Sequence, residues 1–384
     1  MTKACLVHSE ALTEYSFGAE HPMGPHRVRA AVELARHLGV LDALDLVEPP
    51  PGDDDLLRLV HDEAYLEAVK AERLSVEHGL GTEDNPIFPG MHMVTSQITA
   101  ATVTAADLVH SGRAQRAVNI AGGLHHAMPH TASGFCVYND AAVAIRWLQQ
   151  QGVGKIAYLD IDAHHGDGVQ KVFYDDPSVL TISLHESPVH LFPGSGFASE
   201  IGGENARGSA VNVALPATCG SGDWLRAFDA IVPDVLAAFQ PEILISQHGC
   251  DAHAQDPLTD LQLSIEGLVA SYEKVADCAA DHAGGRWVAL GGGGYARRVV
   301  TVAWAHLLGV VAGRPIDPSS PTPQPWRDLY AEKFGDDAPT FMGDDASITY
   351  DPVDWGFNPA SRLDQAIIAT RRAVFPELGL DPGF

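Results

Sequence analysis

Near the middle of the chain, acidic residues and a histidine recur at every second position. In YLDIDAHHGDGVQ (158–170), Asp160, Asp162 and His164 lie two residues apart, so their side chains share one face of an extended strand. Asp162 and His164 can therefore reach one divalent cation, and Asp251, which follows another apolar run, is available as a third ligand. Loop hydrogen bonding is the alternative role, but buried charges generally require a partner or a metal. We predict a metal site at Asp162, His164 and Asp251 with an open position for water or substrate, as catalytic sites have.

Two adjacent histidines, His125 and His126, follow a different apolar run. In a loop both imidazoles can line one cavity, and each needs a hydrogen-bond partner that fixes its tautomer. Asp160 and Asp167 lie on either side of the predicted metal ligands and can supply one carboxylate each. The pattern predicts two oriented imidazoles that transfer protons beside the metal.

Glycine and aromatic residues near other run ends indicate how a substrate is held. GGGGY (291–295) allows a sharp turn and a close approach of the backbone to a ligand, and the hydroxyl of Tyr295 can stabilise an oxyanion. In SGFCVYND and HLFPGSG, Gly134 and Phe135 on one side and Phe192 on the other can form the walls of a channel. Core packing is the alternative for either phenylalanine alone, because buried phenylalanine is common.

Short apolar runs and helical segments must position these residues. The runs are too short for helices and rich in valine and isoleucine, which indicates strands buried on both faces; they span residues 116–123, 155–162, 179–185, 242–249 and 286–294. Helical periodicity covers residues 26–39, 61–74, 91–108, 139–152, 223–239, 264–282, 298–311 and 360–375. This alternation predicts an α/β fold with one open, mostly parallel sheet and helices on both faces. Ligands bind at the carboxyl ends of such strands, which is where the polar residues lie.

The whole chain, residues 1–384, is predicted to form a single domain. RPIDPSSPTPQPW (314–326) is proline-rich and linker-like, and the residues after it are acidic and irregular as far as the last helix. The tail at 314–384 is too short to form a stable hydrophobic core of its own. We therefore expect it to pack on the main domain.

The charge balance and the N-terminal residues restrict the partners and the compartment. The chain has 24 Lys and Arg against 50 Asp and Glu, a net charge of −26, and nucleic acids and anionic membranes require a basic surface instead. The charge can attract a basic protein segment, or it can serve solubility alone. We expect no signal peptide and no transmembrane segment, because no basic stretch followed by a long apolar run begins the chain. Five widely spaced cysteines suit a reducing cytosol, so we predict a cytoplasmic protein.

Together these motifs resemble the zinc-dependent histone deacetylase superfamily, which has the arginase–deacetylase fold. The resemblance rests on GGLHHA, SGFCVYND, DIDAHHGDGV, QHGCDAHAQDPL and LGGGGY, in that order, and RRAVFPELGL in the tail is similar to the bacterial acetoin-utilisation deacetylase branch. It implies hydrolysis of N-acetyl-lysine in proteins to lysine and acetate. The branch implies metabolic substrates such as acetyl-CoA synthetase.

The resemblance also implies a role for individual residues. Zn²⁺, or Fe²⁺ in the cell, would be held by Asp162, His164 and Asp251. The catalytic residues would be His125, His126, Asp160, Asp167 and Tyr295. Substrate would be bound by Asp84, Gly134, Phe135, Phe192 and Gly293. A structural potassium ion would be held by Asp160, Asp162, His164, Ser183 and Leu184. His165 receives no role and is expected to be structural.

Three alternatives remain open at the level of sequence. An arginase-like ureohydrolase with two manganese ions would carry DAHxD, whereas this chain has DAHHGD, with Asp167 one residue further on. An acetylpolyamine amidohydrolase would share the same chemistry behind a different channel mouth. A non-catalytic acyl-lysine binder would keep the pocket without the reaction.

Overall fold

A single eight-stranded sheet forms the centre of the molecule. In this computed structural model, which describes residues 3–18, 21–335, 338–353 and 356–383, the strand order is β2-β1-β3-β8-β7-β4-β5-β6 and each neighbouring pair is parallel. The strands are β1 (Ala4–Val7), β2 (Asp45–Val47), β3 (Arg116–Asn119), β4 (Ile156–Asp160), β5 (Val179–Glu186), β6 (Ala210–Leu215), β7 (Ile243–Gln247) and β8 (Trp287–Leu290). The predicted α/β fold with an open parallel sheet is confirmed.

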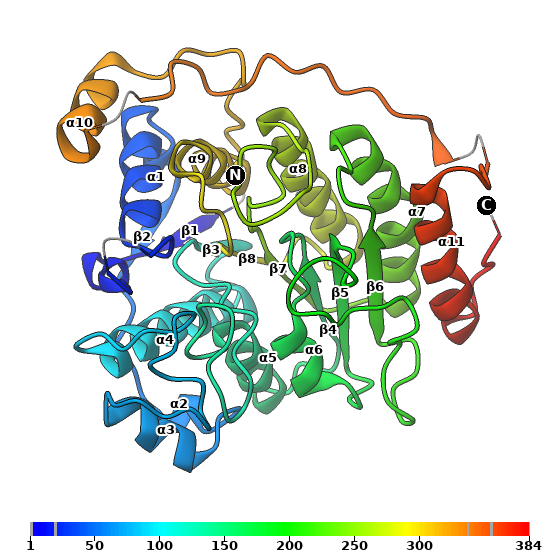
Figure 1. Cartoon of the computed structure of the whole chain (residues 1–384), viewed down its shortest axis with the longest axis horizontal. Coiled ribbons are helices and arrows are strands. Elements are labelled where there is room, and N and C mark those ends of the chain that lie inside the picture. The colour runs from blue at the N-terminus through cyan, green and yellow to red at the C-terminus, as the bar shows by residue number, and fades with distance from the viewer. Residues whose placement is uncertain (1–2, 19–20, 336–337, 354–355, 384) are drawn as a thin grey trace.

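Helices cover both faces of the sheet (Figure 1). On one face lie α1 (His26–His37), α7 (Ser221–Phe239), α8 (Ile265–His282) and α9 (Arg297–Val311). On the other lie α2 (Asp54–Leu57), α3 (Glu63–Lys70), α4 (Met91–His110), α5 (Asp140–Gln150) and α6 (Asp167–Phe173). The central strand β4 shows why both faces are needed, because Ala157 and Leu159 enter one buried cluster and Ile156 and Tyr158 the other.

Three strands and three helices, among them the short α2 and α6, were not among the predicted elements. β1 and β2 extend the sheet beyond β3, and β6 forms its other edge. The proline-rich, linker-like segment leads into α10 (Gln324–Phe334), which has a proline in its first turn, a position that leaves no helical hydrogen bond unmade. Its residues Trp326 and Tyr330 are buried in the same cluster as α1.

The last helix, α11 (Arg362–Val374), lies against β6 and α7 at the far edge of the molecule (Figure 1). A buried ion pair, with Arg226 Nε 3.0 Å from Asp364 Oδ1, connects α7 to α11. Removing either partner would leave a buried charge unpaired, which is strongly destabilising. The contacts of α11 therefore hold the tail on the sheet.

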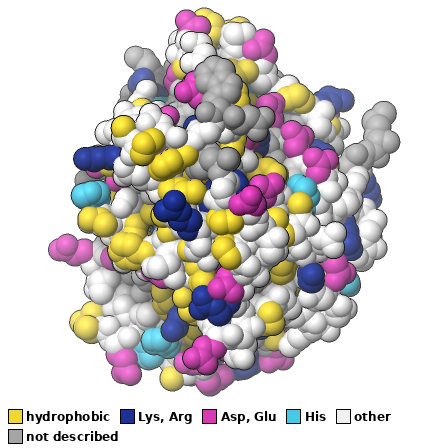
Figure 2. Space-filling view, turned by 90° about the vertical axis from the view of Figure 1, so that its right-hand side faces the viewer, with side chains coloured by type: hydrophobic (Ala, Val, Ile, Leu, Met, Phe, Trp, Pro, Cys, Tyr) yellow, Lys and Arg dark blue, Asp and Glu magenta, His cyan; other side chains and the backbone are white. Residues whose placement is uncertain are grey.

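The surface matches the acidic composition. On the face drawn in Figure 2, the described Lys and Arg side chains lie scattered among acidic and uncharged side chains and form no continuous basic surface. Within the described residues, none of the helices is both long and apolar enough to span a bilayer.

Candidate metal centre and active site

Four neighbouring strands of the sheet bring the chemically active residues together. In the order β3-β8-β7-β4, the loop after β3 carries His125 and His126, and the loop after β8 carries Tyr295. The loop after β7 carries Asp251, and the segment after β4 carries Asp162 and His164. All four strands run in parallel, so their carboxyl ends meet at one edge of the sheet.

The three predicted metal ligands form one buried group. One ligand atom from each of Asp162, His164 and Asp251 lies within 4.8 Å of the others. The Nδ1 atom of His164 lies 3.1 Å from Asp162 Oδ1 and 3.0 Å from Asp251 Oδ2. Two carboxylates and one imidazole directed at a common point match the donor set of a divalent transition-metal ion.

The pKa values of His164 and Asp251 indicate that this site favours a positive charge. Burial would lower the pKa of His164, but its contacts with the two carboxylates outweigh burial and raise that pKa well above its usual value. Burial, followed by the neighbouring charge of Asp162, raises the pKa of Asp251. A divalent cation would take the place of the protons that the raised pKa values favour on His164 and Asp251, so the residues fit the metal that the sequence predicted.

Further groups fix the orientation of the ligand carboxylates. Asp162 Oδ2 accepts hydrogen bonds from Gln247 Nε2 at 2.7 Å and from the backbone N–H of Gly293 at 2.8 Å. Asp251 Oδ1 accepts from the backbone N–H of Ala163 at 2.8 Å. Gly293, predicted to bind substrate, is thus placed against the ligands, and a Cβ on it would lie 2.0 Å from Asp251 Oδ2. The sequence analysis missed the role of Gln247, because its contact with Asp162 depends on the pairing of β7 with β4.

The two histidines each have their own carboxylate. His125 Nδ1 lies 2.7 Å from Asp160 Oδ2, and His126 Nδ1 lies 2.7 Å from Asp167 Oδ1. The two imidazole rings are 4.0 Å apart between centroids. Each Nδ1 is therefore bound to a carboxylate, and the Nε2 atoms remain for other partners.

The two imidazoles have opposite proton affinities. Burial lowers the pKa of His126 to about 4, and the positive charge of His125 adds to that effect. Burial acts on His125 in the same direction, but the charges of Asp160 and Asp162 outweigh it and raise the pKa of His125 to about 9. These shifts favour a neutral His126 and a protonated His125 at neutral pH.

Tyr295 lies at the end of the glycine loop that follows β8. Its ring contacts Phe135 edge-on at 5.6 Å between centroids, and the guanidinium of Arg27 lies 5.3 Å from its ring centre. Burial raises the pKa of its phenol well above the usual value, so the hydroxyl stays protonated and can donate. Arg27, buried and hydrogen-bonded to the carbonyl oxygen of Gly292, was missed by the sequence analysis.

The predicted channel walls meet at His126. Gly134 and Phe135 have φ values of 52° and 65°, and a Cβ on Gly134 would lie 2.4 Å from His126 Cδ2 and 3.0 Å from Phe192 Cε1. The rings of His126 and Phe192 are 5.0 Å apart. Phe192 is 47% exposed, which places it at the mouth. Asp84, predicted to bind the substrate backbone, uses Oδ2 to accept the N–H of Gly134 at 2.9 Å, so it also supports this wall.

Three of the predicted potassium ligands, Asp160, Ser183 and Leu184, lie on the neighbouring strands β4 and β5. Asp160 on β4 pairs directly with Ser183 on β5, and Leu184 follows Ser183. A cavity of about 10 Å³ touches both Asp160 and Ser183. His165, which received no role, is held by Ser195 Oγ at 2.9 Å and Gln170 Oε1 at 3.1 Å, a structural arrangement.

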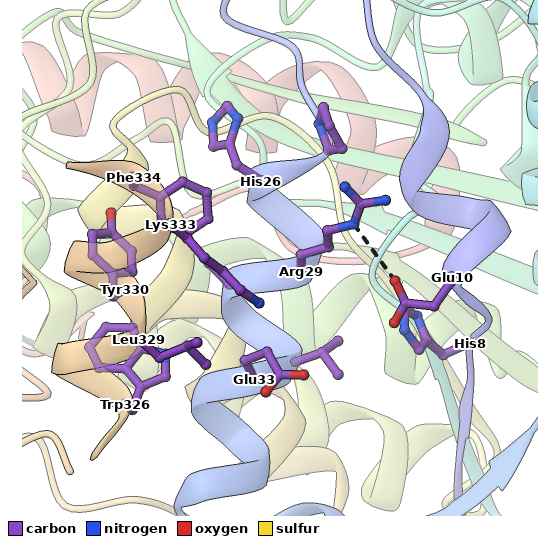
Figure 3. A pocket seen from close by; sticks show the side chains of 13 residues that line it. His8, Glu10, His26, Arg29, Glu33, Trp326, Leu329, Tyr330, Lys333 and Phe334 are labelled. Atoms are coloured by element: carbon purple, nitrogen blue, oxygen red, sulfur yellow. Dashed lines mark ion pairs between the residues drawn. The ribbon is translucent and has the colours of Figure 1, made fainter. Parts of the chain in front are cut away.

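A larger cavity lies elsewhere and includes none of these residues. It has a volume of about 390 Å³ between α1 and α10 and mixes acidic with basic side chains (Figure 3). The ion pair drawn there joins Arg29 Nε to Glu10 Oε2 at 3.7 Å. It is a surface cavity separate from the metal centre.

Comparison with known proteins identifies the family of the chain. Residues 21–311 match the histone deacetylase domain family. The chain is 40% identical to the acetoin utilization protein AcuC of Bacillus subtilis (strain 168) over 361 residues, 92% of each chain. It is 37% identical to AcuC of Staphylococcus aureus (strain MRSA252) over 324 residues, 82% of this chain and 83% of that one.

Solved structures give the same result. The crystal structure of an HDAC homolog complexed with SAHA superposes with a TM-score of 0.82 at 27% identity, covering 96% of this chain and 100% of that chain. The structure of an HDAC homolog from Aquifex aeolicus gives a TM-score of 0.81 at the same identity and coverage. The predicted fold and the resemblance to the acetoin-utilisation branch are confirmed.

Proposed function

Because the chain belongs to the histone deacetylase domain family, we propose that it is a metal-dependent protein lysine deacetylase. The observation that supports this most directly is the buried group of Asp162, His164 and Asp251, together with two imidazoles that are each bound to a carboxylate. The close approach of Gly134, His126 and Phe192 would suit the extended side chain of an acyl-lysine. The reaction is hydrolysis of the amide to lysine and acetate.

Asp162, His164 and Asp251 would hold Zn²⁺ or Fe²⁺, which supplies Lewis-acid activation of the amide carbonyl and of the attacking water when bound. His126, neutral because burial lowers its pKa, accepts the proton of that water. Asp160 stabilises the protonated form of His125 beside the base, and Asp167 fixes the tautomer of His126. The hydroxyl of Tyr295 donates to the oxyanion as it forms. A protonated imidazole then delivers a proton to the leaving amine.

The substrate and the setting are inferred from the relatives and from the charge. The relatives are named acetoin utilization proteins, which favours a metabolic protein such as acetyl-CoA synthetase as the substrate. A net charge of −26 favours protein over nucleic acid or anionic membrane as the partner. The five unpaired, buried cysteines suit the cytoplasm. A potassium ion at Asp160 and Ser183 would balance buried negative charge beneath the metal.

The arginase-like alternative is disfavoured by the position of one residue. A second metal ion would need Asp167 as a ligand, but its Oδ1 is bound to His126 Nδ1 at 2.7 Å and to the N–H of Gly168 at 2.9 Å. Asp167 is also absent from the group of three residues whose ligand atoms lie together. We therefore propose one catalytic metal ion per chain.

The test is acetate release from acetyl-lysine peptides by protein loaded with Zn²⁺ or Fe²⁺, with the metal content measured in parallel. Tyr295→Phe should lower turnover by about 10²- to 10³-fold. A hydroxamate should abolish release. Peptide binding without release would support a non-catalytic binder, faster hydrolysis of acetylspermidine would support a polyamine substrate, and two manganese ions with urea release would support a ureohydrolase.

A further inference from the structure

The glycine loop before Tyr295 has no side chains with which to hold itself in place. Its position depends on backbone contacts, such as that of the Gly293 carbonyl oxygen, which accepts the N–H of Cys250 at 3.0 Å. At Tyr295 a side chain, rather than the backbone, holds the loop. The backbone N–H of Tyr295 donates to Asp256 Oδ2 at 2.7 Å, and the N–H of Ala296 reaches the same oxygen at 3.4 Å. One carboxylate therefore holds the backbone at the tyrosine.

Asp256 is well placed for this task. It is only 7% exposed and lies in the loop after β7, five residues beyond Asp251. Its other oxygen, Oδ1, accepts the N–H of Leu258 at 3.1 Å, and its own N–H donates to the carbonyl oxygen of His253 at 2.8 Å. The carboxylate thus joins the loop that carries a metal ligand to the loop that carries the tyrosine.

Asp256 also substitutes for a missing helix cap. Helix α9 begins at Arg297, and the preceding Ala296 has no side chain that could accept a backbone hydrogen bond. The carboxylate of Asp256, supplied by another loop, accepts the N–H of Ala296 and places negative charge near the positive end of the helix dipole. The hydrogen bond and the interaction with the helix dipole both restrict the backbone at Tyr295 to one position.

The hydroxyl of Tyr295 has no protein anchor of its own. Among the described residues it makes no hydrogen bond, and the side chain is in contact with the ring of Phe135 and the guanidinium of Arg27. Ring packing and the backbone position therefore determine where the hydroxyl points. A backbone shift at Tyr295 would move the hydroxyl directly.

We propose that Asp256 is a positioning residue that sets the hydroxyl of Tyr295 against the metal centre by holding the backbone of Tyr295 and Ala296. The proposal rests on the proposed role of Tyr295 as an oxyanion donor. A displacement of about 1 Å at a reacting group can lower the rate by about 10²-fold. Loss of the Asp256 carboxylate should therefore affect kcat more than KM.

A double-mutant cycle of the metal-loaded full chain tests this. Asp256→Ala should lower kcat for an acetyl-lysine peptide about 10- to 100-fold, with KM changed less than about threefold. In the Tyr295→Phe background the same change should lower the residual kcat less than about threefold, because the hydroxyl is already absent. Asp256→Asn, which keeps one acceptor oxygen, should recover part of the loss. Equal losses in the two backgrounds, or an unchanged kcat, would refute the positioning role.

The matched control is Asp260→Ala, the same change at an exposed position in the same loop, which should keep wild-type kinetics. If Asp256→Ala does not unfold cooperatively, the cycle is run with Asp256→Asn and judged by the same criterion. Affinity of the zinc-loaded protein for acetohydroxamate gives a readout without turnover, and Asp256→Ala should weaken it only when Tyr295 is present. If Asp256 and Tyr295 are coupled in acetohydroxamate affinity but the wild type releases no acetate, only the proposed function is refuted. If the wild type releases acetate but the two residues are not coupled, only the positioning role is refuted.

Discussion

His126 Nδ1 lies 2.7 Å from Asp167 Oδ1, and this contact determines which nitrogen of the imidazole is free to accept a proton. Asp167→Asn places an amide beside that nitrogen, and an amide N–H there favours the wrong tautomer. We expect kcat to fall about 10- to 100-fold with little change in KM, since the contact orients the base rather than the substrate. Steady-state kinetics with an acetyl-lysine peptide would measure both. A wild-type kcat would show that Asp167 does not orient the base.

Gln247 should influence metal affinity without being a ligand. Its Nε2 atom donates to Asp162 Oδ2 at 2.7 Å, so Gln247→Leu removes the group that orients one ligand carboxylate. Supporting contacts of this kind typically change metal affinity about 10- to 100-fold. Competition with a fluorescent zinc chelator would measure the loss. Thermal unfolding of the metal-free variant would show whether the loss of zinc affinity comes from general destabilisation of the fold. An unchanged zinc affinity would contradict the prediction.

Metal affinity should rise with pH. The raised pKa values of His164 and Asp251 mean that these groups hold protons near neutral pH in the absence of a cation, and a bound ion must displace them. The logarithm of the zinc association constant should therefore increase by about one to two per pH unit, with the steepest rise where these protons are bound. Chelator competition between about pH 5.5 and 8 would measure this slope. A flat or falling profile would show that the ligands are already deprotonated.

Gly134→Ala should block the channel. The new Cβ would lie 2.4 Å from His126 Cδ2 and 3.0 Å from Phe192 Cε1, so His126 or the wall must move. We expect kcat/KM to fall by about tenfold or more, and hydroxamate affinity to fall with it. Gly112→Ala is the matched control, because Gly112 also has a positive φ, 71°, but a Cβ there meets nothing within 4 Å. Equal kinetics for the two variants would exclude a steric role for this position.

Asp344 should stabilise the loop after β7 in a pH-dependent way. Its Oδ2 atom accepts from His253 Nε2 at 2.8 Å and from the N–H of Ile265, the first residue of α8, at 2.7 Å. The hydrogen bond from His253 lowers the pKa of Asp344 despite its partial burial. A carboxyl whose pKa is lower in the folded state stabilises above its unfolded pKa, about 3.9, and loses that effect as the pH falls through the folded value.

Asp344→Ala should therefore lower the free energy of unfolding by about 1 kcal/mol at pH 7, and this difference should shrink below about pH 4. Thermal unfolding across this range would measure it. Asp277→Ala, the same change at an exposed position on α8, should show a smaller effect at pH 7. A constant difference between wild type and Asp344→Ala at all pH values would contradict the electrostatic origin.

The sequence by itself determined the chemistry of the candidate site and much of the fold class. Side-chain alternation placed Asp162 and His164 on one face, and apolar runs between helical segments indicated a parallel sheet. These patterns are local, so they can be recognised in the sequence without knowledge of tertiary contacts. The edge strand β2 was missed because its three residues give too little periodicity to recognise.

Only the tertiary structure decided which loops meet. The strand order β3-β8-β7-β4 brings His126, Tyr295, Asp251 and Asp162 to one edge, and that order reflects pairing between segments far apart in the chain. The roles of Gln247 and Asp256 became visible for the same reason, since their partners lie 85 and 39 residues away. Hydrogen bonds between distant loops depend on packing and register, and no local spacing encodes them. The residues proposed to do the chemistry could be read from the sequence, whereas the residues that hold them in place required the fold.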